Sequence, residues 1–354
     1  MPPVGGTGNS GGSAGGGQLS DGVAFAADRV VVTGVRGTTS PAAASTIQLH
    51  NGGQTAASLS SLALSGTNLA LFRIASPAAL PVTLAAGADL AVTLELSTSS
   101  AEIPPAPANK DQGSVLLTAT LTATFGTSKL SANVYGLVLT QANYEPTLGQ
   151  VLTTLGYALN VGKAQNNWNP NTSMDATSLP GLEAGSDEVA ASHFVKAGAG
   201  NVELQVVARF SPVGELPYGW YSTTSGCPSG CTTVGSMARI GDAQTSDKAR
   251  MVYPPLKAGS ATEFDPGSAP FGIWIYSDQK TQKFMEGGNM LNGDWDYSQD
   301  ALNSPANVHR FKSYPLKDAT GTAVPHSYLV AVEEAGNGDY QDYVFVLSNV
   351  TAMP

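Results

Sequence analysis

The stretch Leu90-Ala91-Val92-Thr93-Leu94-Glu95-Leu96 decides the fold class, because an apolar side chain recurs at every second position. Side chains of a β-strand point alternately to the two faces of a sheet, so this spacing predicts a strand with one buried face. The residues before it, Ala86-Gly87-Ala88-Asp89, have the composition of a turn. The turn and the alternating stretch together predict one strand of a β-sheet protein.

Further short stretches between residues 20 and 140 have strand character and are separated by polar turns such as Asn51-Gly52-Gly53 and Gly126-Thr127. These stretches are residues 29–32, 45–49, 61–64, 115–121 and 131–136. Short strands at this spacing are typical of a β-sandwich. We therefore expect residues 20–140 to form one sandwich domain.

The same region carries a recognisable order of residues. The order is Ile47-x-Leu49-x-Asn51-Gly52-Gly53, then Leu64-Ser65-Gly66-Thr67-Asn68 with Phe72 following, then Ala86-Gly87 before a strand and Gly113 before a Thr-rich strand. It resembles the immunoglobulin-like ASPM–SPD-2–Hydin family over about residues 25–140. The resemblance implies an immunoglobulin-like spacer or interaction domain without catalytic residues.

Residues 141–165 are expected to link two halves of the chain. Leu148, Val151, Leu152 and Leu155 fall on one face of a helix, and Gly156 is placed to end it. The sequence predicts one short linker helix here and no other helix.

Residues 166–354 return to strand-like sequence with more aromatic residues and long polar loops. The strongest candidates are residues 202–210, 271–276, 309–314, 328–333 and 343–347. Two antiparallel sheets in a jelly-roll-like sandwich would bury these stretches. We therefore expect an all-β protein, an immunoglobulin-like sandwich followed by a jelly-roll-like β-sandwich.

Composition excludes several functions. Apolar residues make up 42% of the chain and charged residues only 12%, which suits a secreted β-protein better than a cytosolic helical one. The formal net charge of −10 argues against nucleic acid as a partner, because phosphate contacts need a basic face. No apolar run is long enough for a membrane helix, so we expect no membrane span.

The N-terminus predicts an extracellular or cell-surface protein. Residues 1–19 form a flexible Gly/Ser-rich tether, without the apolar core of a signal peptide. Such a tether resembles the start of an exported protein or lipoprotein whose signal was removed, with a possible lipid anchor upstream. An artificially added segment would have the same composition.

Cys227 and Cys231 enclose a short Pro-Ser-Gly turn. Their spacing favours a small-loop disulfide, which fits an oxidising compartment. Free thiols are an alternative, whereas a metal site would need further ligands.

The C-terminal segment carries the main candidate site. Glu333 and Glu334 end a strand, a Gly/Asn turn follows, and Asp339 and Asp342 precede the next strand. Carboxylates that meet at one hairpin repel one another unless a cation or hydrogen-bond donors neutralise them, and Ca²⁺ prefers such oxygen ligands. We predict a structural calcium site, with turn capping by the aspartates or catalysis as alternatives.

The segment also resembles the ending of bacterial surface domains of the DUF4114 class, found in adhesins and anchored exoproteins. The match comprises Glu333 or Glu334, Asp339, Asp342 and the closing Val344-Phe345. The family often has Asn where Gln341 stands, so one ligand departs from the pattern.

A second acidic loop contains Asp294, Asp296 and Asp300, which imitates the start of a calcium loop. Gln299 stands where a helix-loop-helix site has Gly, so a calcium ion here would sit in a sandwich loop, and a solvated turn is the alternative. The loop also interleaves aromatic residues, and a second aromatic cluster lies earlier in the chain. The candidate ligand-binding residues are Trp295, Tyr297, Tyr218, Trp220 and Tyr221. Aromatic faces beside polar groups suit a glycan, although a packed core cluster would give the same pattern.

Catalytic motifs are nearly absent. Gly8-Asn9-Ser10-Gly11-Gly12 has the G-x-S-x-G form but lies in the tether, and the four histidines are scattered. We therefore predict a secreted or cell-surface adhesion protein with a calcium-stabilised β-sandwich that contacts a glycan or cell-surface protein. The alternatives are an extracellular carbohydrate-active hydrolase and a structural subunit of a surface layer or fibre.

Overall fold

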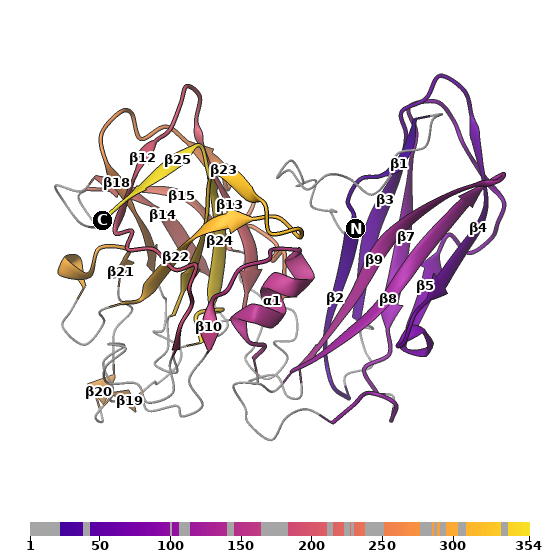
Figure 1. Ribbon diagram of the computed structural model, residues 1–354, viewed down its shortest axis with the longest axis horizontal. Coiled ribbons are helices and arrows are strands. Elements are labelled where there is room, and N and C mark those ends of the chain that lie inside the picture. The colour runs from indigo at the N-terminus through magenta and orange to yellow at the C-terminus, as the bar shows by residue number, and fades with distance from the viewer. Residues whose placement is uncertain are drawn as a thin grey trace. The chain divides into compact units, whose positions relative to one another are not determined.

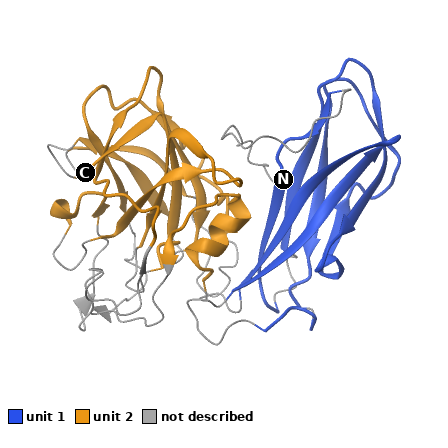
Figure 2. Ribbon diagram, in the orientation of Figure 1, with its two compact units in different colours: residues 1–107, 113–141 blue, residues 108–112, 142–354 orange. Residues whose placement is uncertain are grey.

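The computed structural model describes residues 22–37, 43–99, 101–105, 114–139, 145–163, 183–210, 215–222, 227, 230–237, 251–276, 285–286, 289–290, 295–303, 309–333 and 339–354. The chain divides into two compact units (Figure 2). Unit 1 comprises residues 1–107 and 113–141, and unit 2 comprises residues 108–112 and 142–354. Each is a β structure, which confirms the all-β fold class.

Unit 1 contains two sheets. One has the order β1-β3-β7-β5, with β1 Val23–Phe25, β3 Ala43–Asn51, β7 Asp89–Leu96 and β5 Phe72–Ser76. The other has the order β2-β9-β8-β4-β6, with β2 Arg29–Val35, β9 Ser128–Leu139, β8 Ser114–Phe125, β4 Ala57–Ser65 and β6 Val82–Leu84. A short 3₁₀-helix, η1 Leu69–Leu71, precedes β5. Strands β2 and β9 pair in parallel, and the other described pairs in the unit are antiparallel.

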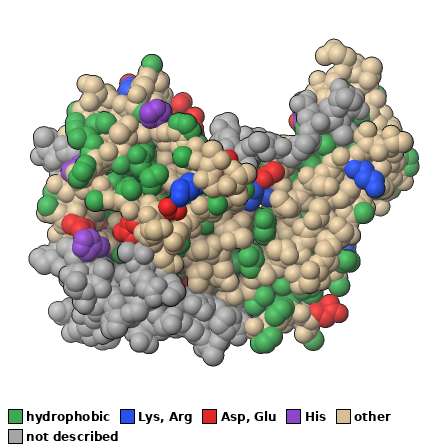
Figure 3. All heavy atoms as spheres, viewed as in Figure 1, with side chains coloured by type: hydrophobic (Ala, Val, Ile, Leu, Met, Phe, Trp, Pro, Cys, Tyr) green, Lys and Arg blue, Asp and Glu red, His purple; other side chains and the backbone are tan. Residues whose placement is uncertain are grey.

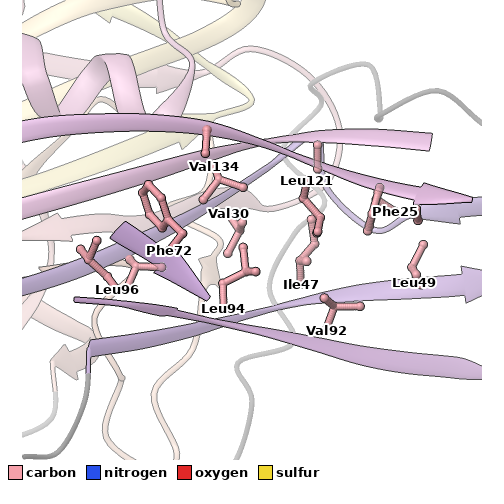
Figure 4. Packing of buried hydrophobic residues seen from close by; sticks show 14 of the residues in the cluster. Phe25, Val30, Ile47, Leu49, Phe72, Val92, Leu94, Leu96, Leu121 and Val134 are labelled. Carbon is pink, nitrogen blue, oxygen red and sulfur yellow. The ribbon is translucent and has the colours of Figure 1, made fainter. Parts of the chain in front are cut away.

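The alternation that predicted these strands places their apolar faces between the two sheets. Val92, Leu94 and Leu96 of β7 are buried, and they face Val30 and Val134 of the other sheet (Figure 4). Burial of apolar surface is the main stabilising term for a sandwich of this size. The six strands expected in this half of the chain are confirmed as β2, β3, β4, β7, β8 and β9.

Asn51, at the end of β3, fixes one turn of unit 1 from inside the protein. Its buried side chain donates through Nδ2 to the carbonyl oxygens of Thr55 at 2.9 Å, Leu84 at 3.0 Å and Ala85 at 3.1 Å. Its Oδ1 accepts from the amide of Gly53 at 3.1 Å. The Asn-Gly-Gly turn is therefore joined to the strand end at β6 by one side chain.

Unit 2 also contains two larger sheets, antiparallel in every described pair (Figure 1). The first has the order β15-β14-β18-β12-β25, with β15 Cys231–Met237, β14 Leu216–Ser222, β18 Phe271–Tyr276, β12 His193–Lys196 and β25 Val350–Met353; β21 Trp295–Tyr297 also pairs with β18. The second has the order β16-β13-β24-β23-β22, with β16 Met251–Val252, β13 Val202–Arg209, β24 Tyr343–Ser348, β23 Ala323–Val332 and β22 Phe311–Lys317; β17 Glu263–Phe264 also pairs with β13. Smaller ladders join β10 Gly162–Lys163 to β11 Glu183–Ala184, and β19 Met285–Glu286 to β20 Asn289–Met290. A short 3₁₀-helix, η5 Asp300–Leu302, follows β21.

The core of unit 2 lies between its two main sheets. Tyr218 of β14 packs against Phe345 of β24, with ring centroids 5.5 Å apart, so side chains of both sheets meet. The five strands expected in residues 166–354 are confirmed as β13, β18, β22, β23 and β24. The sequence missed short strands such as β12 and β21, because they are too short to show alternation.

The predicted helix is α1 Leu148–Leu155. Thr147 and Gln150 form a capping box, in which the Thr147 hydroxyl accepts from the Gln150 amide and the Gln150 side chain accepts from the Thr147 amide. Gly156 ends the helix with φ +78°, a left-handed conformation that suits glycine. The expected apolar face is buried, and α1 belongs to unit 2.

The described surface agrees with the low charge of the sequence. On the face seen in Figure 3, charged side chains are scattered among more numerous uncharged ones. Within the described residues, no helix is long and apolar enough to cross a membrane.

Candidate metal centre

Two antiparallel strands bring three of the predicted acidic residues together. Val332 at the end of β23 pairs with Tyr343 at the start of β24, so Glu333 and Asp342 lie at the same end of this pair. Glu333, Asp339 and Asp342 are all buried. Buried carboxylates are rare unless they are paired or coordinate a cation.

Glu145, near the N-terminal end of the sequence of unit 2, also belongs to this cluster. Ligand oxygens of Glu145, Asp339 and Asp342 all lie within 4.8 Å of one another, and this is the one such group among the described residues. Glu145 stands two residues before the Thr147 cap of α1. Glu145 therefore lies next to the capping box that starts the helix.

Glu333 holds the turn that carries the aspartates. Its Oε2 accepts hydrogen bonds from the amides of Asp339 at 2.8 Å and Tyr340 at 3.2 Å. Its Oε1 is buried and accepts no hydrogen bond from any described residue. The carboxylate that caps this turn is therefore Glu333, whereas the sequence alternative assigned capping to Asp339 and Asp342.

Tyr340, between the two aspartates, has φ +58°, a conformation that costs free energy for a residue other than glycine. Its buried side chain stabilises this geometry. The hydroxyl donates to the carbonyl of His309 at 2.7 Å, and the Lys312 ammonium lies 4.6 Å from the ring centroid. Burial, followed by the charge of Glu333, raises the pKa of this phenol well above its ordinary value.

Gln341 links the two ends of the cluster. This fully buried side chain donates through Nε2 to Oε2 of Glu145 at 2.9 Å. Its Oε1 is buried and accepts no hydrogen bond from the described part of the chain. The residue that departed from the family pattern thus contributes both a donor that orients Glu145 and an unused oxygen.

The electrostatics of the cluster are unfavourable without compensation. Burial, followed by the charges of Glu333, Glu145 and Asp342, raises the pKa of Asp339 well above its usual value, although a hydrogen bond from Gln341 opposes the shift. Two buried arginines lie beside the acidic segment. Arg209 pairs in register with Tyr343, and Arg310 Nη1 donates to the Glu333 carbonyl at 3.3 Å.

Metal binding at this site stays a prediction, but the positions of the residues that the sequence singled out can be compared with the structure. Glu333, Asp339 and Asp342 come together, and Glu334 lies outside the described residues. Glu145 was missed, because 196 positions of sequence separate it from Gln341 and no local spacing marks it as a ligand. The buried charges of Arg209 and Arg310 were missed for the same reason.

The second acidic loop does not form a comparable cluster. Both oxygens of Asp300 contact His309, at 2.6 Å from its amide and 2.9 Å from Nδ1. Asp296 is buried within β21, and Asp294 lies outside the described residues. The contacts with His309 occupy the Asp300 carboxylate in this structure, and a calcium site at this loop stays a prediction.

Most of the candidate ligand-binding aromatics are core residues. Tyr218 and Trp220 pack in the main core, where Trp220 stacks on Phe264 with centroids 5.8 Å apart. Burial raises the pKa of Tyr218 to about 12. Tyr221 and Tyr297 pack edge to face at 5.2 Å in a smaller cluster with Trp274. The burial of Tyr218, Tyr221 and Tyr297 and the packing of Trp220 fit the alternative of a packed core cluster.

Trp295 remains half-buried at the edge of that smaller cluster, with its ring centroid 4.8 Å from Trp274 and 4.9 Å from Tyr276. Cys227 and Cys231 border the same cluster and form the expected disulfide, with Cα atoms 5.0 Å apart. The Cys227 amide donates to the Tyr297 hydroxyl at 3.1 Å. The disulfide and this hydrogen bond therefore hold Cys227 against buried aromatic residues.

Comparison with known proteins gives only distant similarity. No family model and no curated protein matches this chain, so membership of the DUF4114 class stays a prediction. The ASH / PapD-like domain of human CEP192 is 15% identical, covers 33% of this chain and 85% of its own, and has a TM-score of 0.22. The periplasmic chaperone SfaE is 11% identical, covers 77% of this chain and 98% of its own, and has a TM-score of 0.27.

The secreted serine protease VesC from Vibrio cholerae is 10% identical, with a TM-score of 0.25. The match covers 95% of this chain and 51% of that protease. These TM-scores are low, so the fold rests on the strand pairing and packing of this chain. That pairing makes each unit a β-sandwich.

Proposed function

We propose that unit 2 is a calcium-stabilised β-sandwich whose cation is held by Glu145, Asp339 and Asp342. One observation carries the proposal. Carboxylate oxygens of three residues, which come from the N-terminal and C-terminal parts of the sequence of unit 2, lie within 4.8 Å of one another. Asp339 and Asp342 are buried, and the nearby side chains of Glu333 and Gln341 each have a buried oxygen that accepts no hydrogen bond from a described residue. Oxygen atoms in such an arrangement offer a cation more ligands than the three carboxylates alone.

Charge balance favours a divalent ion. Four acids that interact electrostatically, Glu145, Glu333, Asp339 and Asp342, lie in this part of unit 2, and two buried arginines, Arg209 and Arg310, lie beside the acidic segment. With every group ionised, this leaves a formal charge of −2 among these described residues. One divalent cation would neutralise that charge and offset part of the cost of burying several carboxylates together.

The chemistry of the ligands favours Ca²⁺ over Zn²⁺ or Mg²⁺. All the candidate ligands are hard oxygens, without the nitrogen or sulfur that Zn²⁺ selects. Calcium binds oxygens at about 2.3–2.6 Å, so opposite ligands stand up to about 5 Å apart, whereas Mg²⁺ needs about 4 Å. Oxygens that all lie within 4.8 Å of one another are compatible with calcium coordination.

Isothermal titration calorimetry of the full chain with Ca²⁺ tests the proposal. We expect one site in the wild type, and at least a tenfold loss of affinity, about 1.4 kcal/mol, in Asp339→Asn and Glu145→Gln. Glu203→Gln removes an exposed carboxylate from β13 and is the matched control, with unchanged affinity. Unaltered binding in both site variants, or no binding by the folded wild type, would refute the calcium site.

We further infer that this module acts outside the cell or at its surface, where it contacts a glycan or a protein. The disulfide between Cys227 and Cys231 supports an oxidising compartment. Half-buried Trp295, braced by Trp274 and Tyr276, is the aromatic face that suits a sugar ring. A glycan array should therefore lose its signal with Trp295→Ala and keep it with Tyr253→Ala, which removes another exposed aromatic ring.

A further inference from the structure

Ser192, His193 and Gln299 form a chain of hydrogen bonds that the calcium site does not use. The Ser192 Oγ lies 2.8 Å from Nδ1 of His193, and Nε2 of His193 lies 3.0 Å from Oε1 of Gln299. The sequence gives no sign of this arrangement, because 106 positions separate His193 from Gln299. All three side chains are partly exposed.

The direction of these hydrogen bonds follows from the chemistry of the groups. An amide oxygen only accepts, so Nε2 of His193 must carry the proton that it donates to Gln299. In the neutral imidazole, Nδ1 then has the free electron pair, and the Ser192 hydroxyl donates to it. A hydroxyl that donates to an oriented imidazole is the arrangement of an activated nucleophile and its general base.

Buried groups beneath the array hold its members in place. The Ser192 amide donates to the Met353 carbonyl at 3.1 Å, and the Ser192 carbonyl accepts from the Ser298 hydroxyl at 2.8 Å. The Gln299 amide donates to the hydroxyl of buried Tyr221 at 3.2 Å. These hydrogen bonds hold Ser192 and His193 beside β25, and they hold Gln299 in the segment that follows β21.

The array lies on the outer face of its sheet. Phe194 of β12 points into the core, so its neighbour His193 points to the opposite face. Met353 of β25 pairs directly with His193, which places both side chains on that face, and Met353 is exposed. Exposed Leu302 follows three residues after Gln299. These exposed apolar side chains suit an acyl group without charge.

We propose that Ser192 is a nucleophile that takes an acyl group from small apolar carboxylic esters, with His193 as its base and Gln299 as a positioning residue. As Ser192 Oγ bonds to the ester carbonyl carbon, its proton passes to Nδ1 of His193. The bond from that carbon to the leaving oxygen then breaks, and this oxygen takes the proton from Nδ1 and departs as an alcohol. Water hydrolyses the acyl-serine in the same way, releases the acid and restores the Ser192 hydroxyl.

Acylation by p-nitrophenyl butyrate tests the proposal. The full-length protein is treated with the ester and quenched in acid, and the butyryl adduct is mapped by peptide mass spectrometry while nitrophenolate release is followed. We expect an adduct at Ser192, with none at that position in Ser192→Ala. General-base catalysis is worth about 10²–10⁴-fold, so His193→Gln should slow acylation by at least about 10²-fold.

Two further variants separate chemistry from folding. His326→Gln replaces an exposed histidine of β23 and should acylate at the wild-type rate. Gln299→Glu should acylate faster than wild type at an unchanged melting temperature, because a carboxylate stabilises the imidazolium that forms. Absence of the Ser192 adduct in the folded wild type, or an equal rate in His193→Gln, would overturn the proposal. A slower or unchanged rate in Gln299→Glu would overturn the role of Gln299.

Discussion

Single buried carboxylates dominate the chemistry of unit 2. Asp339 is fully buried and lies near other acids, so burial first and their charges second disfavour its charged form in the folded protein when no cation is present. The pKa values of Asp187, Asp265 and Asp318 are shifted the other way, below the usual value of an aspartate. Hydrogen bonds from Lys317, Lys196 and Thr320 respectively are the main cause that lowers the pKa of these three.

This contrast predicts how stability depends on pH without metal. The pKa of Asp339 is raised in the folded state, so its contribution to stability is present below the unfolded pKa and is lost as pH rises through the folded pKa. In EDTA, the melting temperature should therefore fall as the pH is raised from about 5 towards alkaline values. The three aspartates with lowered pKa are ionised in both states throughout that range and add no slope.

Asp339→Asn should remove much of that fall, and it should melt higher than the wild type at the upper pH in EDTA. Differential scanning calorimetry across this range checks both expectations. A wild-type melting temperature that rises with pH in EDTA would show that the buried acids are already compensated within the protein.

Asn51 makes a separate prediction for unit 1. Asn51→Ala removes the buried donor to the Leu84 carbonyl, whereas the Ala85 carbonyl keeps the hydrogen bond from the Ala88 amide at 3.1 Å. Leaving buried groups unsatisfied costs about 1–3 kcal/mol, so unfolding free energy should fall by about this amount. Asn133→Ala, at an exposed position of β9, should change it by less than about 0.5 kcal/mol. Urea unfolding and hydrogen exchange of β3 measure the difference, and equal effects would contradict the role of Asn51.

At the scale of elements, strand periodicity was the most informative feature of the sequence. Val92, Leu94 and Leu96 alternate with polar residues because one face of β7 is buried, and the buried face is visible in the residue order. Helix α1 was equally accessible, because its apolar face and Gly156 lie within one short segment. The packing of Trp220 and Tyr221 was harder to predict, because these adjacent residues of one strand pack in two different apolar clusters.

The capping box of α1 couples an element to the metal site. Thr147→Ala removes the hydrogen bond from Gln150 at 3.1 Å and should cost about 1 kcal/mol of stability. Because Glu145 lies two residues before this cap, Ca²⁺ affinity should fall severalfold as well. Thr153→Ala, at an exposed position of the same helix, is the control for both quantities. Loss of stability without loss of affinity would show that the cap does not position Glu145.

At the scale of the whole molecule, the two sandwiches could be predicted from the sequence, whereas only some residues of the candidate metal site could. Local patterns identify strands, and the hairpin between β23 and β24 brings Glu333 and Asp342 together through neighbouring sequence. Glu145 and the array of Ser192, His193 and Gln299 depend on contacts between distant parts of the chain. Such contacts follow from the packing of sheets and leave no local pattern.

The central claim is that a cation stabilises unit 2, and thermal unfolding of the full chain in excess Ca²⁺ against EDTA at matched ionic strength tests it most directly. A ligand at about 100 times its Kd stabilises the folded state by about 2.7 kcal/mol, so a clear rise in melting temperature is expected. The rise should be absent in Asp339→Asn and retained in Glu203→Gln. An identical melting temperature in Ca²⁺ and EDTA at neutral pH would contradict the account and leave the carboxylates balanced by protons and arginines alone.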